Sequence, residues 1–168
     1  MQMKKTLMML LMALPMSVMA QMKFGHFNSS EIIPTMTEYT TAQSELEALA
    51  KQYESDLKLM QEELQKKSQE FEQQQNALPE NIKQRRQQEL QDLYQRYQQN
   101  YQDNQEAMQK AQQEKMGAIT EKVMAAVKKI GDEGGFVYIM DVVGGAPYIS
   151  PTLSTDISGQ LKAALGIK

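Results

Sequence analysis

Apolar side chains in the middle of the chain recur at intervals of three and four residues. Between Leu46 and Leu64 the intervals are 3, 4, 4, 3 and 4, and a similar series runs from Leu90 to Ile130 with polar residues at three of its positions. A 3, 4, 4 pattern advances eleven residues in three turns, which keeps these positions on one helix face. We therefore predict two long amphipathic helices, nearly straight or weakly right-handed in their supercoil.

A short segment, residues 76–81, interrupts this pattern. It contains Pro79, which is unfavourable inside a helix but suits the first turn of a new one. The segments on either side, 29–77 and 80–131, have nearly equal lengths of 49 and 52 residues. The sequence therefore predicts an antiparallel helical hairpin over residues 29–131, with its tip near residues 76–81.

Folding the chain at Leu78–Pro79 brings apolar residues of the two arms together, for example Leu64 near Leu93. Each arm can reach roughly 70 Å at the rise of an α-helix. Toward the tip the sequence becomes polar, because residues 61–113 contain 18 glutamines. We therefore expect the distal hairpin to be held weakly and to flex.

The base of the first arm carries its own signals. Pro34 is expected to kink the helix close to its start. Ser29 or Ser30 is expected to cap it, because a serine side chain can accept a hydrogen bond from the first turn.

The C-terminal part of the chain has the character of a β-sheet. Phe136–Met140 is an uninterrupted apolar run, which predicts a strand covered on both faces. Gly144 and Gly145 predict a turn, after which Ala146–Ser150 is expected to return as a second strand. Pro147 within that segment favours an edge position or an irregular start.

A short helix is expected to close the chain. Ser154 or Thr155 can cap it, and Ile157, Leu161 and Leu165 form its apolar stripe.

These parts define the predicted architecture, an α+β fold in which a long helical hairpin projects from a small β body. The body comprises residues 21–28, which contain a first strand at Met22–Phe27, and residues 132–168. So few residues form only a weak independent core, and the chain has no cysteine to cross-link it. We therefore expect copies to associate through the sheet. The candidate contact residues are Phe24, Phe136, Val137, Tyr138, Ile139 and Met140.

The N-terminal residues 1–20 have the layout of a secretory signal peptide. Lys4 and Lys5 precede the apolar run Thr6–Leu14, and Val18–Ala20 has small residues at a suitable cleavage position. The alternative, an N-terminal membrane anchor, is disfavoured because the apolar run is too short to span a bilayer. Cleavage would leave a chain with 16 basic and 21 acidic residues, a net charge of −5.

This charge argues against a general nucleic-acid binder, and membrane contact is expected to be peripheral at most. The chain also carries no recognisable catalytic constellation. It has no cysteine, and its single histidine, His26, has no second histidine to share a metal. The glycines are not followed by the Lys-Ser/Thr pair of a phosphate-binding loop. We therefore expect no enzymatic activity, no metal and no cofactor.

Two features near the tip admit a functional or a structural interpretation. Lys83, Arg85 and Arg86 form a basic patch that could contact anionic lipid or an acidic client, or could simply keep the helix end soluble. Tyr94 and Tyr101 need not both fit a two-helix seam, so at least one is expected to be exposed.

The order of elements resembles the Skp/OmpH family of outer-membrane-protein chaperones. A strand ending in Phe27-Asn28-Ser29 leads into the hairpin, Gly135–Asp141 forms an aromatic and aliphatic strand, and Thr155–Ser158 starts the closing helix. The resemblance covers nearly the whole mature chain. It implies a homotrimer whose hairpins surround a cavity and hold unfolded outer-membrane β-barrel proteins in the periplasm without ATP. Familiar members are strongly basic, whereas this chain is acidic, so no lipopolysaccharide site is carried over.

Our main hypothesis is therefore a periplasmic holding chaperone, and the alternative is a structural coiled-coil spacer or scaffold of the cell envelope. A mildly apolar cage suits weak binding of many unfolded chains. The candidate client-binding residues are Leu57, Met60, Leu64, Phe71, Leu90, Tyr94, Tyr101 and Met108.

Overall fold

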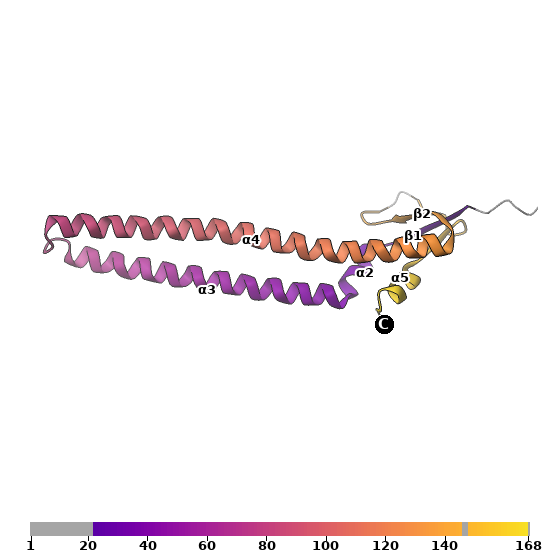
Figure 1. Ribbon diagram of the computed structural model, residues 1–168, viewed down its shortest axis with the longest axis horizontal. Helices are drawn as coiled ribbons and strands as arrows, with labels where there is room; N and C mark the ends of the chain where they lie inside the picture. The colour runs from indigo at the N-terminus through magenta and orange to yellow at the C-terminus, as the bar shows by residue number, and fades with distance from the viewer. Residues whose placement is uncertain (1–21, 146–147, 168) are drawn as a thin grey trace, which may run out of the picture.

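A computed structural model of the protein describes residues 22–145 and 148–167 (Figure 1). It confirms the predicted fold class, a long helical hairpin attached to a small sheet. The proposed signal peptide lies outside the described residues. In chain order the elements are β1 (Lys23–Phe27), α2 (Ser29–Ile32), a 3₁₀ helix (Ile33–Thr35), α3 (Thr37–Gln74), α4 (Glu80–Gly134), β2 (Phe136–Asp141), β3 (Ser154–Asp156) and α5 (Ser158–Ala164).

The two arms are α3, with 38 residues, and α4, with 55 residues. Pro79 lies immediately before α4, and its carbonyl accepts hydrogen bonds from the backbone N–H groups of Ile82 and Lys83, both at 3.0 Å. The proline thus starts the second helix, where its missing N–H costs nothing. The C-terminal part of α4 continues past the start of α3 and runs alongside the sheet (Figure 1).

The first arm is broken rather than bent at its base. The 3₁₀ helix contains Pro34, and Met36 is extended, with φ −76° and ψ 137°, before α3 begins. The predicted capping residues are wrong: the side chain of Asn28 caps α2 by accepting a hydrogen bond from the N–H of Ser30 at 3.1 Å. Asn28 has the extended backbone that a cap requires, whereas the helix has already begun at Ser29.

The sheet has the order β2-β1-β3, and both strand pairs are parallel. The prediction that Ala146–Ser150 returns as the second strand is wrong. Gly144 and Gly145 do form a turn, with φ 84° and 86°, but Tyr148–Ser150 is not in a strand and residues 146–147 lie outside the described part. The third strand is instead β3. It pairs with the edge of β1 opposite to β2.

The predicted caps of the closing helix are also corrected. Ser154 and Thr155 belong to β3, and the N-cap position of α5 is Ile157, which makes no side-chain cap hydrogen bond. The carboxylate of Asp156, the last residue of β3, accepts a hydrogen bond from the Ser158 N–H at 2.8 Å. The predicted stripe is buried: Ile157 and Leu161 are 0% exposed and Leu165 is 9% exposed.

The core lies where α2, β1, α5 and the C-terminal part of α4 meet. It continues a short way between the arms. Each large apolar side chain buried in this way stabilises the fold by about 1.5–3 kcal/mol. The fully buried large side chains of this core are Phe27, Ile32, Met36, Ile157 and Leu161.

Within one chain, β2 is covered on one face only. Phe136 and Ile139 pack against the core, whereas Val137, Tyr138 and Met140 are 59%, 52% and 49% exposed. The expectation of two covered faces is therefore wrong for a single chain, because α4 and α5 supply only one layer.

Candidate functional site

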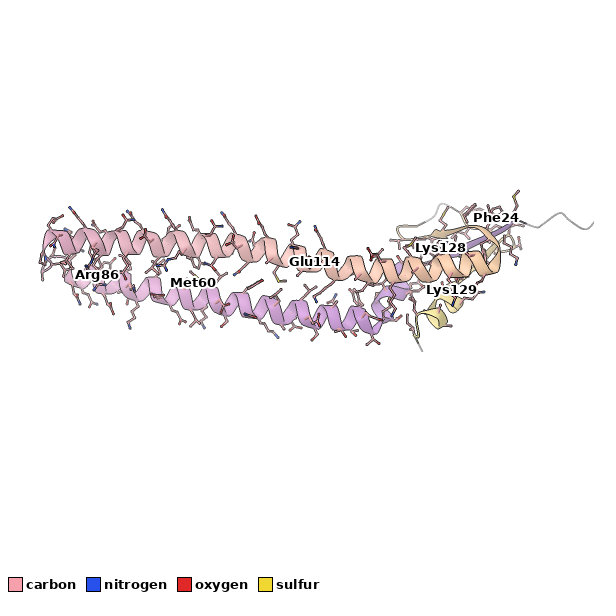
Figure 2. All side chains as sticks on the ribbon, viewed as in Figure 1. Phe24, Met60, Arg86, Glu114, Lys128 and Lys129 are labelled. Carbon is pink, nitrogen blue, oxygen red and sulfur yellow. The ribbon has the colours of Figure 1, made fainter. Side chains whose placement is uncertain are left out.

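The seam between the arms is thinly packed over most of its length. Ala42 is the last buried residue of α3, and on α4 only Leu93 is buried before Ile119. Side chains of the rest of the hairpin project outward from both arms (Figure 2). A long stretch of apolar residues is therefore only half covered.

The structure divides the candidate client-binding residues into two groups. Tyr94 and Tyr101 are 51% and 49% exposed, so both lie outside the seam, whereas Tyr97 between them is half-buried. The half-buried candidates are Leu57, Met60, Leu64, Phe71, Leu90 and Met108.

Sequence reasoning missed two exposed apolar residues of the hairpin, Met124 on α4 and Leu59 on α3. Met124 is 54% exposed and Leu59 is 62% exposed, more than either tyrosine. The signal for Leu59 was available, because this residue falls between the seam positions Leu57 and Met60 and so breaks the three-and-four spacing.

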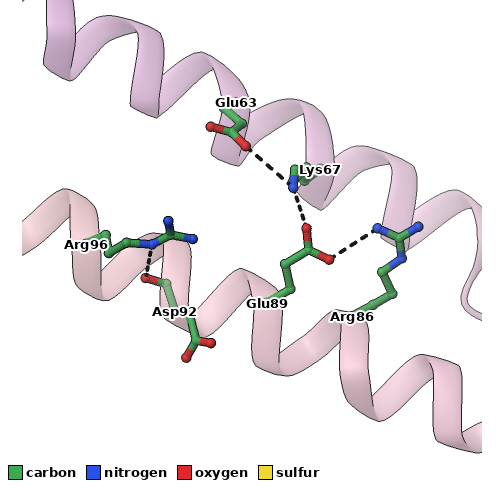
Figure 3. A network of polar contacts seen from close by, with 6 residues as sticks. All are labelled: Glu63, Lys67, Arg86, Glu89, Asp92 and Arg96. Carbon is green, nitrogen blue, oxygen red and sulfur yellow. Dashed lines mark hydrogen bonds and ion pairs between the residues drawn. The ribbon is translucent and has the colours of Figure 1, made fainter.

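Near the tip, an ion-pair network crosses the seam (Figure 3). Lys67 of α3 contacts Glu89 of α4, and it also lies 3.5 Å from Glu63. Arg86 donates to the other oxygen of Glu89 at 3.2 Å. The hydrogen bond from Lys67 holds the pKa of Glu89 below its ordinary value, and the same bond raises the pKa of Lys67. An ion pair therefore joins the two arms near the tip.

Apolar residues surround this network. Phe71, Leu78 and Leu90 line a small cavity of about 30 Å³ together with Lys67 and Glu89. Charged and apolar contacts thus both join the arms near the tip, and the flexing of the distal hairpin stays a prediction.

The predicted basic patch at the tip contains two exposed residues, Arg85 and Arg86, and the half-buried Lys83. Arg86 also pairs with Glu89, which neutralises part of its charge. Binding of an anionic partner by these residues stays a prediction.

Two further ion pairs cross the seam near the base, Lys115 with Glu45 and Lys122 with Glu38. The hydrogen bond from Lys122 lowers the pKa of Glu38. All the cross-arm pairs join positions that lie within about one helical turn of the partners predicted by folding at Leu78–Pro79. Their signal was therefore present in the sequence, although no ion pair was predicted.

The outer face of the sheet is a second uncovered apolar surface. The rings of Phe24 and Tyr138 contact each other with centroids 4.8 Å apart, and Met140 lies beside them. Two residues that the sequence did not single out join this surface, Tyr148 at 77% and Leu153 at 73% exposure. Together they line a hollow of about 250 Å³.

His26 also lines this hollow. Its Nδ1 is 2.8 Å from the hydroxyl oxygen of Ser154, which ties β1 to β3 beyond the backbone ladder. Of the six candidate assembly residues, Phe24, Tyr138 and Met140 therefore lie on the outer face and Val137 is exposed. Phe136 and Ile139 belong to the core side.

Residues 22–145 and 148–167 contain no group of three His, Cys, Asp or Glu side chains able to hold a metal ion. In the same residues no helix is long and apolar enough to cross a membrane.

Comparison with known proteins identifies a matching family and a similar solved structure. The sequence matches the family described as outer membrane protein (OmpH-like) over residues 23–165. A similar solved structure is that of a protein from Caulobacter crescentus CB15, described as an outer membrane chaperone (OmpH-like). The two share 14% identity with a TM-score of 0.73, over 87% of this chain and 85% of the other. No curated protein matches the sequence.

Proposed function

Because this chain belongs to the OmpH-like outer membrane protein family, we propose that it is an ATP-independent holding chaperone for unfolded outer-membrane β-barrel proteins in the periplasm. The family supports a chaperone role. The Skp/OmpH resemblance suggests the clients and the compartment, and the signal-peptide pattern of residues 1–20 agrees with export.

The observation that carries the proposal is the thin seam of the hairpin. Leu59, Tyr94 and Tyr101 are about half or more exposed, and the apolar residues near them, apart from the buried Leu93, are only half-buried. Tyrosine offers a large contact area and a polar hydroxyl at low entropic cost, which suits weak binding of many different chains. Unfolded β-barrel proteins present apolar and aromatic segments of this kind.

We also propose that the protein is a homotrimer joined through the outer face of the sheet. Phe24, Tyr138, Met140, Tyr148 and Leu153 leave an apolar patch there, and exposed patches rimmed by polar residues commonly mark interfaces. Three joined bodies would place three hairpins around one cavity.

The test is refolding of a urea-denatured β-barrel membrane protein by dilution, with light scattering as the readout. Equimolar trimer should suppress aggregation without ATP. The double variant Tyr94→Gln/Tyr101→Gln should suppress it less. The control Gln95→Ala/Gln102→Ala changes two exposed positions on the same helix and should behave as the unmodified protein.

A protein that leaves aggregation unchanged would refute the chaperone proposal. If small-angle scattering then showed a closed rod, the alternative of a structural spacer would account for the fold.

A further inference from the structure

We propose that the hairpin opens in its middle, between ion-paired ends, and that the opened middle accepts an apolar stretch of the client. The middle segment is defined here as residues 46–62 of α3 and 94–114 of α4. This inference rests on the proposed function and adds where and how the client enters.

The first support is the distribution of cross-arm ion pairs. The network of Glu63, Lys67 and Glu89 lies on the tip side of the middle segment, and the pair of Lys115 with Glu45 lies on its base side. Among the described residues, no ion pair or side-chain hydrogen bond joins the two arms within the middle segment itself.

The second support is packing. No residue of the middle segment is buried, whereas Leu93 is buried at its tip end and Ile119 lies just beyond its base end. The half-buried Asn104 lies on the predicted seam face of α4, where an apolar residue would pack better. Separating the arms here therefore disrupts less packing than at either end.

The third support is that each helix of the middle segment is stabilised locally. Lys51 donates to Glu47 at 2.7 Å in α3, and Gln99 donates to Asp103 at 2.7 Å in α4. Contacts between positions i and i+4 stabilise isolated helices. The arms can thus move apart as intact helices.

Opening would change the surface offered to a client. Leu59, Tyr94 and Tyr101 are exposed already, and separation of the arms would add Leu57 and Met60. Charged side chains flank the resulting apolar and aromatic strip at both ends. It would select a short apolar segment rather than a folded surface.

Distances between spin labels test this inference in the full mature protein, because the chain has no cysteine of its own. Asp56→Cys/Gln102→Cys places labels on exposed positions across the middle, and Gln73→Cys/Gln84→Cys places them across the tip. The denatured β-barrel protein should shift the middle distances to longer values and leave the tip distances unchanged. Without client, the middle distribution should already be the broader of the two.

The variant Lys67→Met tests whether the ion-pair network holds the arms together at the tip. It should broaden the tip distribution to the width of the middle one, as should 0.5 M NaCl on the unmodified tip, because salt screens partly exposed charges. The control Lys66→Met removes a neighbouring charge outside these ion pairs and should leave the tip unchanged.

Binding of a fluorescent client, measured by anisotropy, distinguishes a failure of the chaperone proposal from a failure of the middle-opening inference. If the client binds and only the tip distances lengthen, or none do, the middle-opening inference is wrong. If no client binds, the chaperone proposal and client entry both fail. The client-free distributions then decide whether the middle opens at all.

Discussion

At the scale of single residues, the junction of α4 with β2 depends on the absence of one side chain. A Cβ at Gly134 would lie 2.5 Å from an atom of the Phe136 ring, which packs against the core. Gly134→Ala should therefore destabilise the protein by about 1–3 kcal/mol, the usual cost of overpacking. The same substitution at Gly117, where nothing lies within 4 Å, should stabilise α4 by about 0.5–1 kcal/mol.

Urea denaturation of both variants measures the two effects as opposite shifts of the midpoint. Equal midpoints for Gly134→Ala and the unmodified protein would mean that the Phe136 ring moves aside freely.

Residue properties also explain why the exposure of side chains on the hairpin was only partly predictable from the sequence. The three-and-four spacing identifies positions that face the other arm, such as Leu57 and Met60, but two helices cannot cover them fully. Tyr94 and Tyr101 are both exposed because a two-helix seam is too narrow to take them beside Tyr97. How much of a seam position stays exposed depends on the number of packed layers, which the spacing does not encode.

At the scale of elements, the carboxylate of Asp156 joins the end of β3 to Ser158, the first residue of α5. Hydrogen bonds from the hydroxyl and the backbone N–H of Ser158 hold the pKa of Asp156 below its ordinary value of 3.8. Because the folded-state pKa is the lower one, the stabilisation is complete above the unfolded value. It is lost as the pH falls through the folded value.

Asp156→Ala should therefore cost about 1 kcal/mol at neutral pH, the usual net contribution of a hydrogen bond. Asp156→Asn keeps an accepting oxygen but cannot titrate. Its stability should change less between pH 5 and pH 2 than that of the unmodified protein. Urea midpoints across this range make the measurement, and parallel curves for the two proteins would contradict the assigned role.

The elements differ in how far local sequence determines them. Pro79 and two matched periodic segments were sufficient to predict the hairpin, because helices are local structures. β3 was missed because Ser154–Asp156 carries no apolar alternation, and its partner β1 lies more than a hundred residues away. Gly144-Gly145 suggested an antiparallel return, whereas the strands of this sheet are parallel and need no tight turn.

At the scale of the whole molecule, a single chain leaves its small body half-covered. The inner face of the sheet lies on the core with α4 and α5, and the outer face carries Phe24, Tyr138 and Met140. An extended hairpin attached to so small a body needs further burial to be firmly anchored. Association of copies through the outer face would supply it and would orient the hairpins together.

This geometry identifies the substitution that tests assembly. Ile139→Asp, which the apolar run of β2 first suggests, is unsuitable because Ile139 packs inward beside Gly25 and Gly131, so a carboxylate there would unfold the body. Tyr138→Asp is suitable because Tyr138 is 52% exposed in one chain, and the folded monomer can tolerate the charge. In an apolar interface, by contrast, the unpaired carboxylate would cost several kcal/mol, about 2–7 for a polar group and more for a charge.

Light scattering coupled to size exclusion should therefore report a trimer for the unmodified mature protein and a folded monomer for Tyr138→Asp, with helix content retained by circular dichroism. Leu59→Asp is the matched control, because Leu59 is 62% exposed on α3 and lies in the hairpin, away from the sheet. It should remain trimeric. A Tyr138→Asp protein that stayed trimeric would place the interface elsewhere, and the outer face would then be free to bind something other than a second copy.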